Sequence, residues 1–136
     1  MKPIEIIKET YALLESYKDL IELNDIQGLE HTKASLIANK GLIGGYLIDY
    51  LDLYKQAKRK YNINRLGYYK RYRGEGQSQA DAENNSKLET IKDLEEMDNM
   101  FIKKEKCRVL LDDTTDCIIN IQSTLKRLYA EEKYNM

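Results

Sequence analysis

The chain has 136 residues, of which 42% are hydrophobic and 33% are charged, with a single proline. This length supports one domain with a modest core and excludes a separate catalytic domain, while the composition is that of a folded, largely helical protein. Net charge is −1, yet residues 53–73 carry eight basic side chains and no acidic one, which leaves 14 basic against 23 acidic elsewhere. The asymmetry predicts a polyanionic partner at the basic segment.

The first expected helix runs from Pro3 to about Leu23, with the proline in the first turn, where its missing N–H costs nothing. Charged residues in every turn of this segment exclude a signal peptide and a membrane span. We therefore expect a cytoplasmic protein. One apolar stripe recurs at spacings of three and four: Ile4, Ile7, Tyr11, Leu14, Tyr17 and Ile21.

After a stop at residues 24–28, a second helix is expected from near Leu29 to about Asn62. The string "GLIGG" places three glycines inside it, each costing about 1 kcal/mol relative to alanine, which predicts a close helix approach or a kink. Two rows of apolar residues recur every seven positions: Leu36, Ile43, Tyr50 and Ala57, and Leu47, Tyr54 and Tyr61.

Residues 74–85 contain no large apolar side chain and no periodicity, so they are expected to form an exposed loop. Ser86 with Glu89 resembles a capping box and predicts the start of a third helix. The sequence leaves open whether that helix continues through "KKEK". The expected organisation is an N-terminal helical part over residues 1–73, the loop over 74–85, and a C-terminal helical oligomerisation part over 86–136.

A heptad seam near the C-terminus predicts a helical partner without saying whose helix it is. It can pack against the second helix of the same chain or against another subunit. The seam residues predicted for self-association are Cys107, Leu111, Ile118, Ile121, Leu125 and Leu128, with Thr114 between them.

Few residues suit catalysis. The only histidine, His31, has no cysteine near it, and no phosphate-binding loop of the Gly-x-x-x-x-Gly-Lys-Ser/Thr type is present. Cys107 and Cys117 are too far apart for a redox pair and are expected to be reduced core thiols. We predict no enzyme activity, no cofactor and no metal site. Asp112, Asp113 and Asp116 are expected on a solvated helix face, and a small metal-dependent nuclease stays a remote alternative.

The string "LGYYKRYRGEG" combines rings with positive charge. Cations follow phosphates while unpaired bases stack on aromatic faces, so this combination is typical of sequence-tolerant single-strand binding. The alternative is that the tyrosines are core residues and the lysines favour the negative end of a helix dipole. The predicted nucleic-acid-binding residues are Lys55, Lys58, Arg59, Arg65, Tyr68, Tyr69, Lys70, Arg71 and Arg73.

Several strings resemble the UvsY-type recombination mediators of T-even-like bacteriophages. They are "YKQAKRKYNINRLGYY" before "RGEG", then "NSKLET", "LLDDTTDCI" and "IQSTLKRL", and the resemblance covers about residues 26–130. It places Lys58, Arg59 and Arg65 on basic positions of the family's strand-binding segment, and Leu66, Tyr68 and Tyr69 on its leucine and tyrosine pair. One family lysine is replaced by Ile63, and Lys70, Arg71 and Arg73 can supply that charge.

The resemblance implies an accessory factor of the infected bacterial cell that helps load a phage recombinase onto single-stranded DNA coated by a single-strand-binding protein. It also implies a ring-like homo-oligomer of about six or seven subunits that contacts both proteins. We therefore expect an all-α fold, an elongated helical hairpin or bundle with a long C-terminal helix. An oligomeric phage structural or regulatory adaptor that binds a protein partner is the alternative.

Overall fold

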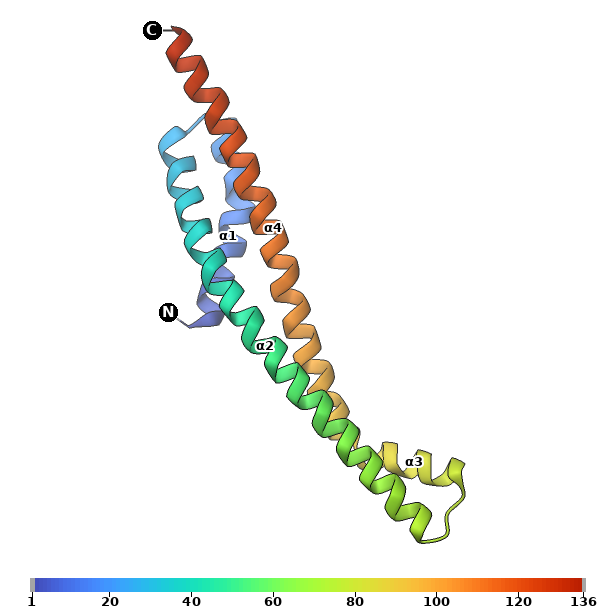
Figure 1. The fold of residues 1–136 in the computed structure, drawn as a ribbon. Coiled ribbons are helices and arrows are strands. Elements are labelled where there is room, and N and C mark those ends of the chain that lie inside the picture. Colours follow the sequence, from blue (N-terminus) through green and yellow to red (C-terminus); the bar gives the residue numbers. More distant parts are fainter. Residues whose placement is uncertain (1, 136) are drawn as a thin grey trace. The chain divides into compact units, whose positions relative to one another are not determined.

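The computed structural model describes residues 2–135, which form helices and no strand (Figure 1). The all-α prediction is therefore confirmed for this part of the chain. The helices are α1 (Pro3–Glu22), α2 (Ile26–Gly74), α3 (Gln79–Glu89) and α4 (Ile91–Asn135). Contacts divide the chain into a first unit, residues 1–47 and 107–136, and a second unit, residues 48–106, so α2 and α4 each contribute to both.

The connection between α1 and α2 consists of residues 23–25 only. It is short because these residues both end α1 and cap the start of α2. Asn24 adopts a left-handed φ of 52° directly after α1. The Asp25 carboxylate then accepts a hydrogen bond from the Gly28 amide (2.9 Å), which satisfies a donor in the first turn of α2. A Cβ at Gly28 would collide with the Asp25 side chain. As a result α2 begins at Ile26, three residues before the expected start.

The first unit holds a hydrophobic core between α1, the first half of α2 and the second half of α4. Leu29, Leu36 and Ile121 are completely inaccessible to solvent. Polar contacts join the helices around this core: the Asn39 amide donates to Thr10 Oγ1 (3.2 Å), which itself donates to the Ile6 carbonyl (2.7 Å). Buried polar groups of this core are thus hydrogen-bonded, as burial requires.

The C-terminal seam belongs to this core. Cys107, Ile118, Ile121, Leu125 and Leu128 are buried within the chain, and the last four pack in one cluster with Leu29 and Leu36 of α2. Leu111 is half-buried, and its neighbour Leu110 is the buried residue of that turn. The prediction that the seam joins subunits is therefore corrected for the five buried residues, because side chains covered by their own chain cannot cover another subunit.

The glycines of "GLIGG" do not mark a close approach. A Cβ built on Gly41, Gly44 or Gly45 would meet no atom within 4 Å, and α2 runs through all three positions. Of the two alternatives predicted for these glycines, close helix packing is wrong for the described residues, and the kink stays a prediction.

The second unit combines the second half of α2, α3 and the first half of α4. Its buried residues are all small or short: Ala57, Ala82, Ser86 and Thr90. Larger apolar side chains stay accessible, with Phe101 43% exposed and packed against Tyr54 at a ring-centroid distance of 5.7 Å. This unit is therefore held together by a thin apolar layer and by polar contacts at its edge.

The expected loop over residues 74–85 is mostly helix. Only residues 75–78 connect α2 to α3, and Ser78 caps α3 by accepting a hydrogen bond from the Asp81 amide (3.2 Å). Ser86 is a buried residue inside α3 rather than an N-cap. The chain turns at Thr90, and α4 then continues without interruption through the "KKEK" string.

Candidate nucleic-acid interface

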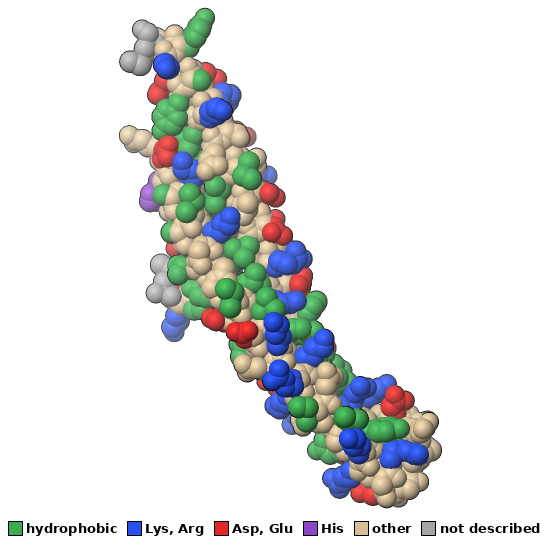
Figure 2. All heavy atoms as spheres, in the orientation of Figure 1, with side chains coloured by type: hydrophobic (Ala, Val, Ile, Leu, Met, Phe, Trp, Pro, Cys, Tyr) green, Lys and Arg blue, Asp and Glu red, His purple; other side chains and the backbone are tan. Residues whose placement is uncertain are grey.

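The basic segment, residues 53–73, is helical throughout. The period of 3.6 residues per turn therefore determines on which side of α2 each of its side chains lies. We name one exposed strip of α2 the basic face. It consists of Lys55, Lys58, Arg59, Lys70 and Arg73, together with Asn62 and Leu66. These positions lie within about a third of the circumference of α2 and extend about 27 Å along it. All seven are exposed. Figure 2 shows Lys and Arg side chains gathered along the surface of this part of α2.

Four cations of the basic face have no acidic partner in the described part of the chain. Lys55, Lys58, Arg59 and Lys70 form no ion pair with residues 2–135. Arg73 donates to the Gln77 carbonyl (2.8 Å), which leaves its charge unneutralised. An exposed row of unneutralised cations attracts a polyanion, because no internal ion pair has to be broken first.

Two other cations of the segment are engaged within the chain. Lys60 lies between Asp93 (3.6 Å) and Glu96 (3.3 Å) of α4, and the hydrogen bond to Glu96 with both charges raises its pKa. Arg71 pairs with Glu75 at 3.3 Å. Exposed pairs of this kind contribute little stability, but they reduce the charge that these residues offer to a ligand.

The adjacent tyrosines Tyr68 and Tyr69 face different surroundings, since consecutive helical residues differ by about 100°. Tyr68 is half-buried and its ring stacks on Tyr72, with centroids 6.3 Å apart. The Tyr72 hydroxyl donates to Glu89 of α3 (2.9 Å), and this hydrogen bond raises the tyrosine pKa. Tyr72 thus fastens α2 to α3 and the ring of Tyr68 packs on that of Tyr72, which disfavours the base-stacking role predicted for Tyr68.

Tyr69 instead borders a concavity of ≈ 330 Å³ between α2 and α3. The α2 side is formed by Arg65, Leu66 and Tyr69, and the α3 side by Gln79, Glu83 and Ser86. The Arg65 guanidinium lies 5.7 Å from the centroid of the Tyr61 ring, so a cation–π contact positions it at the edge. Three positions carried over from the resemblance, Arg65, Leu66 and Tyr69, therefore meet in one hollow of the surface.

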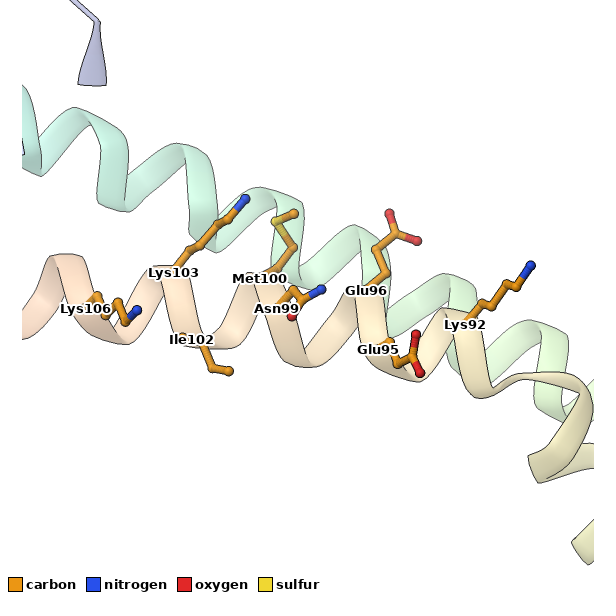
Figure 3. A pocket seen from close by; sticks show the side chains of 8 residues that line it. All are labelled: Lys92, Glu95, Glu96, Asn99, Met100, Ile102, Lys103 and Lys106. Atoms are coloured by element: carbon orange, nitrogen blue, oxygen red, sulfur yellow. The ribbon is translucent and has the colours of Figure 1, made fainter. Parts of the chain in front are cut away.

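A second hollow of ≈ 430 Å³ follows α4 alone (Figure 3). All its side chains come from this one helix: Lys92, Glu95, Glu96, Asn99, Met100, Ile102, Lys103 and Lys106. In the view they project outward along the helix without converging on a point. This hollow is an exposed strip of mixed charge along one helix.

The remaining sequence-selected residues have structural positions. Cys107 and Cys117 are buried free thiols as predicted, and burial raises the pKa of both, that of Cys117 to about 11. Asp112 pairs with Arg108 at 3.3 Å on the exposed side of α4, and His31 is exposed on α2. Residues 2–135 contain no group of three or more His, Cys, Asp or Glu side chains placed to hold a metal ion. Nor does any helix within that range have a segment apolar and long enough to cross a membrane.

Sequence reasoning missed the α3 side of the concavity because it treated that stretch as a loop. A usable signal was present in "SQAD", where Ser78 precedes Asp81 by three residues, which is the spacing of a helix N-cap. The apolar pattern gave no second signal, since α3 buries only Ala82 and Ser86.

Comparisons with protein families, curated proteins and solved structures find no match for this chain. The assignment of function therefore depends on the chain's own residues and on the resemblance of its strings.

Proposed function

We propose that this protein is a non-enzymatic recombination mediator that binds single-stranded DNA through the basic face of α2. The observation that carries the proposal is the row of exposed, unpaired cations at Lys55, Lys58, Arg59 and Lys70 beside the aromatic Tyr69. Phosphates of a strand can follow the cations along the helix, and exposed bases can reach the ring.

The mediator role rests on the resemblance to UvsY-type proteins. In that role the protein helps a phage strand-exchange recombinase displace a single-strand-binding protein. A single basic face binds weakly at physiological salt, since a few phosphate contacts give only non-specific affinity. Repeating the face in a homo-oligomer of about six or seven subunits makes later contacts intramolecular and raises avidity by about 10² to 10⁴.

Self-association in this proposal needs a surface other than the buried seam. The first half of α4 offers one, because Ile91, Leu94, Phe101 and Ile102 are between 36% and 49% exposed and share one side of the helix. Apolar side chains grouped on one helix face are typical of contacts between subunits.

Fluorescence anisotropy tests the proposal with a labelled single strand and the same sequence as a duplex, each at low and high salt. We expect salt-sensitive binding that favours the single strand, because a duplex hides the base faces. Equal affinity for the single strand and the duplex, or an affinity that is the same at low and high salt, would contradict the proposal.

The alternative is an oligomeric adaptor whose basic face meets an acidic protein surface. It is favoured by the same unpaired cations, which attract any polyanion. It predicts either no binding to DNA or equal binding to the single strand and the duplex in the anisotropy experiment.

A further inference from the structure

The concavity between α2 and α3 differs in chemistry from the basic face beside it. The basic face carries only positive charge, whereas the concavity places the Arg65 cation and the Glu83 carboxylate at one hollow. A phosphate entering it would meet the carboxylate as well as the guanidinium. The mixed charge therefore suits a polar but uncharged ligand better than an anion.

The lining also has the parts that recognise a flat aromatic ring. Tyr69 offers a ring edge or face, and the Arg65 guanidinium, positioned by Tyr61, offers a second planar group. Unpaired bases stack on aromatic rings and on guanidinium planes. Leu66, which is 53% exposed, adds an apolar side chain at the mouth.

The opposite side carries hydrogen-bonding groups. Gln79 and Glu83 are four residues apart on α3, so their amide and carboxylate lie on one side of the helix. Ser86 is buried behind them, with its hydroxyl donating to the Glu83 carbonyl (2.8 Å). A carboxylate accepts from the amino group of cytosine, and an amide can pair with adenine.

We infer that this concavity is a binding site for an unstacked nucleobase of the bound strand. This inference rests on the proposed strand binding. Its volume of ≈ 330 Å³ falls at the small end of the ~300–1,000 Å³ range of ligand sites. Lys70 and Arg73 follow Tyr69 within about one turn of α2, so they can hold the phosphates next to the inserted base.

The test compares an oligodeoxycytidine with an abasic strand of equal length and charge, measured by anisotropy on the full chain. Wild-type protein is expected to bind the base-bearing strand about 5- to 140-fold more tightly, from the strength of base stacking on a tyrosine. Tyr69→Leu removes most of this preference and Tyr69→Phe retains it. Tyr134→Leu, at a 91% exposed tyrosine of the first unit, is the matched control and leaves the preference unchanged.

A second variant does not depend on the ring. Glu83→Ala, at an exposed residue, removes the acceptor and lowers the affinity ratio of oligodeoxycytidine to oligodeoxythymidine, because only cytosine has an amino group that donates to the Glu83 carboxylate.

The outcomes separate the two claims. Equal affinity of wild-type protein for cytidine and abasic strands would overturn the base site and leave strand binding standing. An unchanged preference in Tyr69→Leu would also overturn the site. Binding to neither strand would overturn both the site and the proposed function.

Discussion

The two units of this chain bury very different side chains. In the first unit Leu29, Leu36 and Ile121 are inaccessible, and Cys117 packs in the same cluster. In the second unit the buried residues are no larger than threonine, while cations and half-buried rings occupy the surface. Apolar burial supplies most folding free energy, so the first unit carries the stability and the second keeps its side chains available for contact.

The largest expected effect is a large-to-small change in the core of the first unit. Ile121→Ala should lower the free energy of unfolding by about 2–5 kcal/mol, because the buried side chain leaves a cavity. Ile119→Ala, two residues away on α4 at a 53% exposed position, should change it by less than about 0.5 kcal/mol. Urea unfolding measures both, and similar losses in the two variants would contradict the assigned core.

A smaller effect comes from the buried thiol. Burial raises the pKa of Cys117 from 9.0 to about 11, so its neutral form stabilises the fold fully below pH 9. That contribution is lost as the pH rises through about 11, a difference of about 1–3 kcal/mol. Wild-type stability should therefore fall more steeply than that of Cys117→Ala between pH 9 and 11. Parallel pH curves for the two proteins would argue against a buried thiol.

The smallest expected effect comes from a change in the second unit, at the N-cap of α3. Ser78→Ala removes the N-cap of α3 and should cost about 1 kcal/mol, seen as faster amide hydrogen exchange confined to residues 79–89. Ser123→Ala, at an exposed position inside α4, is the control and should leave exchange in α3 unchanged. Faster exchange spreading to residues 107–128 would show that the units do not differ as described.

The sequence predicted elements well where large apolar residues recur. The first helix ends at Glu22, one residue before its expected end, and Leu36 and Ile43 of the seven-residue row are completely buried. The first helix departs from its expected apolar stripe, since Ile4 and Tyr11 are 59% and 45% exposed and Ile6 and Thr10 are buried instead. The apolar spacing therefore located this helix without identifying its buried side. The structure extends α2 to Gly74, twelve residues beyond the expected end near Asn62, and the predicted row of apolar residues at every seventh position ends at Tyr61 and does not mark this extension.

The candidate site was less predictable because half of it depends on tertiary packing. A cation count locates Lys55, Lys58 and Arg59, but it does not show that Lys60 is held by α4. A heptad pattern likewise does not state whose helix fills it, which is why Ile118 and Leu125 were assigned to a subunit contact. The concavity at Tyr69 could not be seen at all while α3 was expected to be a loop.

The central claim is that the positive charge of α2 acts as a strand-binding face, and a matched removal of charge tests it most directly. The first variant replaces Lys55, Lys58 and Arg59 with alanine, which removes three exposed cations from the second unit. The control variant replaces Lys8, Lys18 and Lys126 with alanine, which removes three exposed cations from the first unit. The slope of log affinity for single-stranded DNA against log salt should shallow by about 2 in the first variant and stay unchanged in the second. Equal slopes in the two variants would contradict the account.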